Sequence, residues 1–156
     1  MPKREFLSEE DEKKIVSAIS RAEAGTTGEI RVHLEFTCKK DPLDRAKMLF
    51  HELKMDETKE QTGVILYIAT NDKKVAIYGD AGISEKVGND FWQDEIAKLI
   101  SKFKQEKFEE GIESVVEDIG VKLKQFFPSD GTDPNELDNE ISFKDNREVK
   151  NDQKDG

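Results

Sequence analysis

The sequence predicts an α/β protein, a three-layer α/β/α sandwich around a mixed central sheet, and three observations predict it. Residues 29–37 alternate between apolar and polar side chains, which is typical of a strand with one buried face. Residues 63–70 form a continuous apolar run, as in central strands that are covered on both faces. Residues 74–79 return as a third strand after turn residues 71–74, and so short a link makes the second and third strands antiparallel.

The first expected helix covers residues 7–24 and precedes the alternating strand. Ser8 is a natural N-cap, and the acidic residues after it suit the positive end of the helix dipole. Gly25 stands where a C-terminal cap belongs, because glycine adopts the left-handed conformation that often ends a helix. The segment therefore reads as a complete helix with its own start and stop signals.

The second expected helix covers residues 41–53 and connects the first two strands. Asp41 can cap it, and Pro42 suits the first helical position. A strand, a helix and a second strand form a right-handed crossover when the strands are parallel. The predicted sheet is therefore mixed, with one parallel crossover and one antiparallel hairpin.

Three further helical segments follow the third strand. Residues 81–88 have room for a single turn, and Asn89 can cap a longer helix over residues 90–105. The last helix covers residues 108–127, with apolar side chains at helical spacing, and Pro128 ends it.

The length and composition fit one domain with a polar tail. The chain has 156 residues, of which 35% are hydrophobic and 38% charged, which is more polar than an average domain. We expect the α/β domain at residues 1–128 and an acidic, largely disordered tail at residues 129–156. The tail holds nine acidic and four basic residues, half of the net charge of −10. Within it, residues 137–143 are the one candidate for docking on the domain.

The charge, hydropathy and cysteine content exclude several classes of protein. A net charge of −10 argues against nucleic-acid binding, which needs basic surfaces. No window approaches the roughly 18 apolar residues of a membrane span, and the N-terminus lacks an apolar signal core. Cys38 is the single cysteine, so no disulfide can form within the chain. We therefore expect a cytoplasmic protein with no membrane span, and we take it to be a monomer.

The predicted topology sorts the polar residues onto two edges of the sheet. The edge with the starts of the first two strands and the end of the third gathers Glu29, Thr62, Asp80, Asp90 and Asp94. The opposite edge gathers Cys38, Lys39, Thr70, Asn71 and Asp72. Ligands of doubly wound sheets favour the carboxyl ends of parallel strands, which points to the second edge. The carboxylates point to the first edge, and we give chemistry precedence over fold analogy.

Several catalytic motifs are absent from the sequence. A phosphate-binding loop is missing, and Gly79–Gly82 is too short for a dinucleotide fingerprint. Cys38 and Arg45 approach the spacing of a cysteine phosphatase, but no glycine lies between them to let the backbone amides converge. His33 and His51 lack the spacing of metal ligands. The catalytic residues, if the protein is an enzyme, are therefore unknown at this stage.

Four stretches of the sequence resemble the TPM domain family: TGEIRVHLE, TGVILYIA, AIYGDAGI with the following FW, and a late helix that ends in FFP. The resemblance covers about residues 7–128. The family includes thylakoid-lumen proteins linked to photosystem II repair and described as acid phosphatases, and many short bacterial proteins. The resemblance implies an α/β/α sandwich with a mixed sheet, phosphatase chemistry, and a divalent cation bound near the GD loop.

The resemblance implies a metal site at two positions, Glu29 of TGE and Asp80 of GD. Asp90 and Asp94 lie one helical turn apart, and we add them from the predicted geometry. All four supply oxygen, so Ca²⁺ is the expected ion and Mg²⁺ the second candidate. Each also has an ordinary role open to it, as a turn, strand-start, helix-terminus or solvated surface residue.

Two functions follow, from different classes. The first is a divalent-cation-binding domain in which the metal binds phosphate and activates water for phosphomonoester hydrolysis. The second is a non-catalytic module that binds an unidentified protein partner, with metal structural or absent.

Overall fold

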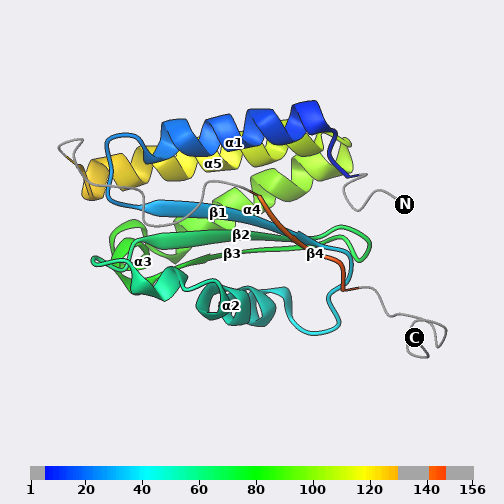
Figure 1. The fold of residues 1–156 in the computed structure, drawn as a ribbon, viewed down its shortest axis with the longest axis horizontal. Coiled ribbons are helices and arrows are strands. Elements are labelled where there is room, and N and C mark those ends of the chain that lie inside the picture. Colours follow the sequence, from blue (N-terminus) through cyan, green and yellow to red (C-terminus); the bar gives the residue numbers. More distant parts are fainter. Residues whose placement is uncertain (1–5, 130–140, 147–156) are drawn as a thin grey trace.

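The computed structural model describes residues 6–129 and 141–146. Figure 1 shows its helices and strands. In chain order they are α1 (Glu9–Glu23), β1 (Glu29–Glu35), α2 (Pro42–Glu52), the 3₁₀ turn η1 (Met55–Glu57), β2 (Gly63–Ala69), β3 (Lys74–Gly79), α3 (Ala81–Val87), α4 (Asn89–Lys104), α5 (Phe108–Phe126) and β4 (Ser142–Lys144). Within these residues, no helix combines the length and the apolar character needed to cross a membrane.

The sheet has the strand order β3-β2-β1-β4. β1 and β2 are parallel, with Glu29 opposite Gly63, and β2 and β3 are antiparallel, with Val64 opposite Gly79. The parallel crossover and the hairpin predicted from the sequence are both confirmed. β4 adds a short parallel strand on the far side of β1, where His33 lies opposite Ser142.

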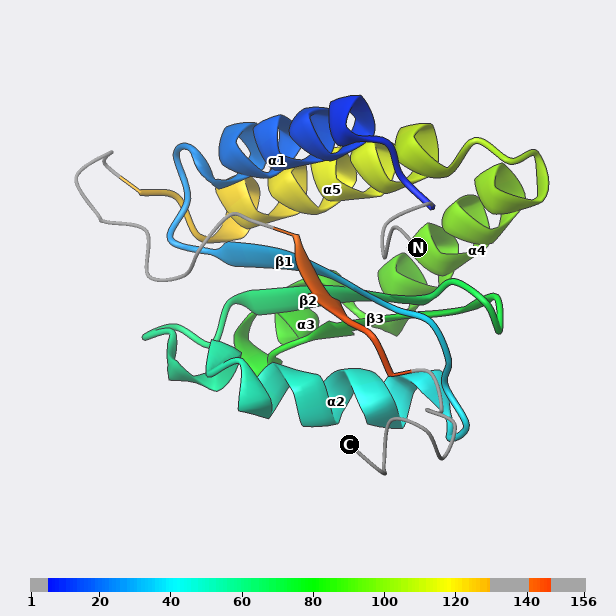
Figure 2. The ribbon, with the colours of Figure 1, turned by 45° about the vertical axis from the view of Figure 1, so that its right-hand side comes forward.

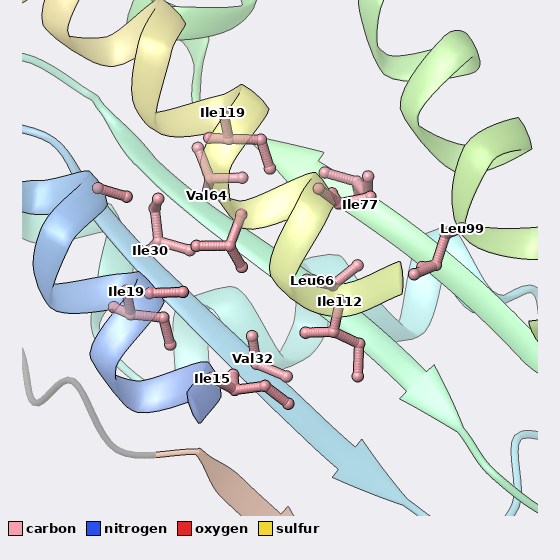
Figure 3. Packing of buried hydrophobic residues seen from close by; sticks show 14 of the residues in the cluster. Ile15, Ile19, Ile30, Val32, Val64, Leu66, Ile77, Leu99, Ile112 and Ile119 are labelled. Carbon is pink, nitrogen blue, oxygen red and sulfur yellow. The ribbon is translucent and has the colours of Figure 1, made fainter. Parts of the chain in front are cut away.

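Helices cover both faces of the sheet, which confirms the predicted α/β/α sandwich. α1, α4 and α5 lie over one face and α2 lies over the other (Figures 1 and 2). The main core lies under α1 and α5, and its buried members include Ile15, Ile19, Ile30, Val32, Val64, Leu66, Ile77, Leu99, Ile112 and Ile119 (Figure 3). Burial of each such side chain stabilises the fold by roughly 1.5–3 kcal/mol.

The polar face of β1 is also buried, which the alternating pattern does not predict. His33 is 3% exposed and Glu35 is fully buried, because α2 and the neighbouring Tyr67 cover this face. A strand predicted to have one solvated face therefore places ionisable side chains in the interior, where each needs a partner.

Part of the predicted tail is a strand. Residues 142–144 form β4, Ile141 is buried, and the Phe143 ring packs edge-on against Phe36 at 5.3 Å between centroids. The C-terminal end of the stretch predicted to dock, residues 141–143, thus contacts the domain. The rest of the predicted docking stretch, residues 137–140, lies outside the described residues, as do residues 130–136 and 147–156 of the tail.

Candidate functional site

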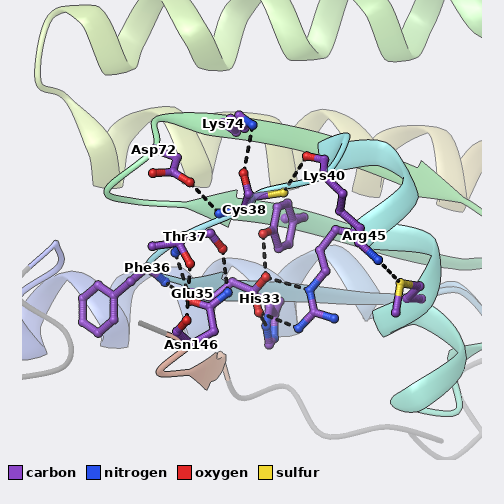
Figure 4. A network of polar contacts seen from close by, with 12 residues as sticks. His33, Glu35, Phe36, Thr37, Cys38, Lys40, Arg45, Asp72, Lys74 and Asn146 are labelled. Carbon is purple, nitrogen blue, oxygen red and sulfur yellow. Dashed lines mark hydrogen bonds and ion pairs between the residues drawn. The ribbon is translucent and has the colours of Figure 1, made fainter. Parts of the chain in front are cut away.

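A buried ionic network lies at the edge of the sheet where β1 ends, and Glu35 is at its centre (Figure 4). Arg45 of α2 binds both carboxylate oxygens of Glu35, from Nε to Oε2 at 2.8 Å and from Nη2 to Oε1 at 2.9 Å. The Tyr67 hydroxyl donates to Oε2 at 2.5 Å, and His33 Nε2 lies 3.2 Å from Oε1. Because a carboxylate can only accept, His33 Nε2 carries the proton in this contact.

These contacts fix the ionisation of the network. Burial by itself raises the pKa of Glu35, but the hydrogen bonds from Arg45, His33 and Tyr67 outweigh burial and lower this pKa to about 2. The hydrogen bond to Glu35 raises the pKa of Arg45 above its usual value. Burial raises the pKa of Tyr67, and the bond to Glu35 adds to that effect. At neutral pH the site therefore holds an ionised carboxylate–guanidinium pair.

β4 and the residues after it complete this edge. Ser142 Oγ lies 2.7 Å from His33 Nδ1, so β4 supplies the second contact of the imidazole. Asn146 Oδ1 accepts from the backbone amides of Phe36 and Thr37 at 3.0 and 2.9 Å, and its Nδ2 donates to the Thr37 carbonyl at 2.6 Å. The Asn146 side chain thus satisfies the backbone where β1 ends.

The loop after β1 is tied to the hairpin between β2 and β3. The Cys38 amide donates to Asp72 Oδ2 at 2.7 Å, and Lys74 Nζ donates to the Cys38 carbonyl at 2.8 Å. The Cys38 thiol is buried and directs Sγ at the Lys40 carbonyl, 3.1 Å away. The prediction that Cys38 is not a phosphatase nucleophile stays a prediction.

An open cleft of about 680 Å³ lies over this network, which we call the carboxyl-edge cleft. Its lining residues are Glu35, Thr37, Cys38, Lys39, Lys40, Arg45 and Asn146. Three of them are cationic and one is a carboxylate, so the lining carries a formal excess of two positive charges. In a protein of net charge −10, this concentration of positive charge suits an anionic ligand.

The opposite edge holds the predicted metal ligands. The Asp80 amide donates to the Gly63 carbonyl at 2.9 Å and the Glu29 amide to the Thr62 carbonyl at 3.3 Å, so these residues do share one edge. Asp80 Oδ1 caps α3 by accepting from Ala81 N at 2.8 Å.

The other two predicted ligands lie at the start of α4. Asp90 and Asp94 are both exposed there. Within residues 6–129 and 141–146, no three His, Cys, Asp or Glu side chains form a cluster that could hold a metal ion. The four-residue metal site therefore stays a prediction.

Sequence reasoning missed Glu23, which lies beside Glu29 at this edge. Both are buried, and Glu23 Oε2 accepts from the Ile30 amide at 2.8 Å. Burial, and then the neighbouring Glu29, raise the pKa of Glu23 to about 8, so Glu23 is protonated at neutral pH and can hydrogen bond to Glu29. A signal existed, because Glu23 continues the helical spacing of Ile15 and Ile19 and so falls on the apolar stripe.

The network at the carboxyl edge was also missed, although Tyr67 gave a signal. Tyr67 stands in an apolar run that is covered on both faces, and a buried tyrosine hydroxyl requires a hydrogen-bond partner. Glu35 lies two strand positions from His33 on the polar face of β1, and Arg45 lies in the next helix. No local pattern joins these three residues.

The comparisons with known proteins agree with the fold as described. The model of the TPM domain matches residues 2–122, so the chain belongs to the TPM domain family. The NMR structure of the BA42 protein from the psychrophilic bacterium Bizionia argentinensis is similar at 48% identity with a TM-score of 0.83, covering 90% of this chain and 97% of BA42. The resemblance found in the sequence is thereby confirmed.

Two more distant structures share the fold alone. The N-terminal domain of a protein from P. gingivalis is 15% identical with a TM-score of 0.66, over 78% of each chain. The N-terminal domain of the cg2496 protein from Corynebacterium glutamicum is 13% identical with a TM-score of 0.60, over 92% of this chain and 84% of that one. Among curated proteins, no significant match is found.

Proposed function

We propose that this TPM domain binds phosphorylated ligands and seats the phosphate group in the carboxyl-edge cleft. The observation that carries the proposal is the lining of that cleft, in which Lys39, Lys40 and Arg45 outnumber the single carboxylate of Glu35. Lysine and arginine are the usual phosphate ligands of proteins, and arginine adds directional N–H donors. The cleft also lies at the carboxyl ends of two parallel strands, where ligands of α/β sheets usually bind.

The network leaves donors for the ligand. Arg45 has five N–H groups, and its bonds recorded among the described residues use Nε and Nη2, so the Nη1 group can face the cleft. Lys40 Nζ contacts Met48 Sδ at 3.2 Å, and a thioether is a weak acceptor that a phosphate oxygen replaces readily. Glu35 keeps the Arg45 guanidinium in one orientation, so less conformational entropy is lost on binding.

A titration tests this proposal. Addition of inorganic phosphate, and then of phosphoserine, to ¹⁵N-labelled protein should give saturable NMR shifts at the amides of Thr37 and Cys38. Lys40→Glu should weaken binding by about tenfold, a difference of ~1.4 kcal/mol. Lys13→Glu, on the exposed surface of α1, makes the same change in net charge and should leave the affinity nearly unchanged. Equal losses of affinity in both variants, or NMR shifts spread over all lysines, would refute phosphate binding in the cleft.

We propose Ca²⁺ binding at the opposite edge as a second function, and one observation favours it. Glu23 and Glu29 are two buried carboxyl groups in contact, and a divalent cation can replace the proton that Glu23 holds. In an NMR titration with Ca²⁺, saturable shifts at Glu29, Asp80, Asp90 and Asp94 would support the site. Mg²⁺ serves as the control ion. Shifts confined to exposed carboxylates would contradict it.

Phosphomonoester hydrolysis belongs with this second proposal and not with the cleft. The seven residues of β1 span roughly 20 Å, so a cation near Glu29 cannot contact a phosphate held near Arg45. Metal-dependent hydrolysis therefore requires that the substrate bind at the Glu29 edge. If hydrolysis with added Ca²⁺ is no greater than that of a Glu29→Gln, Asp80→Asn double variant, the catalytic proposal fails while phosphate binding in the cleft stands.

The cytoplasmic location predicted above stays a proposal, supported by the free thiol of Cys38.

A further inference from the structure

The outer edge of β3 lies at the bottom of a groove. β3 pairs with β2 on one side, and it ends the sheet on the other side. α2 packs on one face of β3 and α4 on the other, so the free edge lies between two helices. A cavity of about 490 Å³ follows it, with walls that include Leu43 and Lys47 of α2 and Trp92 and Ile96 of α4. We call this feature the β3 groove.

The register shows which backbone groups face the groove. The Asp80 amide donates to Gly63, and hydrogen-bonded positions alternate along an antiparallel pair, so Tyr78, Ala76 and Lys74 direct their backbone groups at β2. Val75 and Ile77 consequently direct their N–H and C=O groups outward. Within the described residues, no hydrogen bond to these four groups is recorded.

The free part of the edge is short and has a defined end. The Gly79 carbonyl also points outward, but Ser84 Oγ donates to it at 2.8 Å. Trp92 Nε1 in turn donates to Ser84 Oγ at 3.2 Å, so the first turn of α4 helps to close this end. The open stretch from Val75 to Ile77 offers two donors and two acceptors in the spacing of an extended chain.

We propose that the β3 groove binds an extended segment of a partner protein as an additional strand, antiparallel to β3. Antiparallel pairing lets one partner residue form two hydrogen bonds with Ile77, and a second partner residue form two with Val75. Side chains of the segment then alternate between the two walls. Those opposite Ile77 and Val75 face Trp92 and Ile96 and should be apolar.

The residue between those two faces the α2 wall and should be acidic. That wall carries two charged side chains, Lys47 and Asp41. Asp41 Oδ2 accepts from the first amides of α2, those of Leu43 and Asp44, at 3.0 and 3.2 Å. Lys47 is exposed, and its Nζ lies 5.8 Å from the centre of the Tyr78 ring. The α4 wall carries no charged side chain in the groove, because its lining residues are Asn89, Trp92, Gln93 and Ile96. Charge complementarity thus selects an apolar–acidic–apolar segment.

The helices that flank the groove favour an extended peptide segment over a second copy of this chain as its ligand. Edge-to-edge pairing of two copies would bring α2 and α4 of one copy against those of the other before the strands met. A single extended segment has no flanking layers and fits between the helices.

The test uses two capped peptides with the full-length protein, Ac-Thr-Val-Glu-Val-Thr-NH₂ and the same sequence with lysine in place of glutamate. The glutamate peptide should give saturable NMR shifts at the amides of Val75 and Ile77 and at the Trp92 indole. It should bind about twofold to fivefold more tightly than the lysine peptide, the range of an exposed ion pair. Lys47→Glu should reverse this preference, whereas Lys13→Glu, with the same net charge, should not.

A second pair of variants tests the backbone contacts. Val75→Pro removes an outward N–H without touching the bonds to β2, and it should weaken both peptides by about threefold to tenfold. Val75→Thr keeps that N–H and should bind as the native protein does. The proposal is overturned if shifts fall outside the groove or if Lys13→Glu reverses the preference equally. It is also overturned if sedimentation without peptide shows a dimer that Val75→Pro abolishes.

Discussion

The two ends of β1 each bury carboxyl groups, and they hold them in opposite states of ionisation. At the end of the strand, donors surround Glu35 and lower its pKa to about 2. At the start of the strand, Glu23 has a second carboxyl group as its neighbour, and its pKa rises to about 8. Burial alone raises both values, so the partners decide the outcome. This difference underlies the two proposals, an anion bound through Arg45 at the ionised end and a cation in exchange for the proton at the protonated end.

The largest expected effect comes from removing the cation at the ionised end. Arg45→Met leaves Glu35 buried without its counter-charge, and the free energy of unfolding in urea should fall by about 3–5 kcal/mol. The matched control is Arg21→Met, because Arg21 pairs with Glu113 and Glu117 on an exposed surface and should cost under about 1 kcal/mol. A similar loss of stability in the two variants would show that the buried pair contributes no more than the exposed ion pairs.

The same end should also be sensitive to a single hydroxyl group. Tyr67→Phe keeps the ring in place and removes one donor to the Glu35 carboxylate, which should lower the free energy of unfolding by about 1.5–3 kcal/mol. It should also raise the pKa of Glu35, which a carboxyl NMR titration can follow. An unchanged pKa would mean that Arg45 and His33 alone set the ionisation.

The protonated carboxyl group of Glu23, at the start of β1, should make the stability of the fold depend on pH. The pKa of Glu23 is about 8 in the fold against 4.5 as the ordinary value, so its contribution is complete below pH 4.5 and is lost as the pH rises through 8. Glu95 and Glu109, with pKa values raised by burial to about 8 and about 7, act in the same direction. Glu35 acts in the opposite direction, and its contribution is lost as the pH falls from 4.5 towards 2.

The free energy of unfolding should therefore be greatest at about pH 5. Glu23→Gln retains an acceptor for the Ile30 amide and cannot ionise, so at pH 9 it should be more stable than the native protein by about 1–2 kcal/mol. At pH 5 the two should be nearly equal. Urea unfolding at both values measures the difference, and an equal gain at both would mean that charge is not its cause.

The smallest effect is expected where the tail meets the ionised end. Asn146→Ala removes bonds to the backbone of Phe36 and Thr37, at a site that water can partly reach, and should cost about 1 kcal/mol. Amide hydrogen exchange should quicken at Phe36 and Thr37 and remain unchanged at Val64. Faster exchange across the whole sheet would instead indicate global loss of stability.

The fold was largely predictable because its signals are local. The alternation at residues 29–37, the apolar run at 63–70 and the short link after it fixed three strands and their directions, as the observed pairing confirms. β4 could not be found in this way. It has three residues, and it becomes a strand because β1 offers an edge more than a hundred residues away.

The candidate sites were less predictable for the same reason. Counting carboxylates drew attention to Glu29 and Asp80, which do share an edge, but the count gives no information about partners. Glu35, Arg45 and Tyr67 each have an ordinary local explanation, and only the fold brings them into one network. The preference for carboxyl ends of parallel strands, set aside in the sequence argument, does point to the edge where that network lies.

The pairing of β4 with β1 also determines the order in which the chain can assemble. His33 and Ser142 are 109 residues apart. Closing so long a loop costs conformational entropy, and the contacts of β4 can offset this cost only after β1 is already paired with β2. During synthesis the N-terminal part of a chain emerges and folds first. We therefore expect the three-stranded sheet to form before β4 joins it.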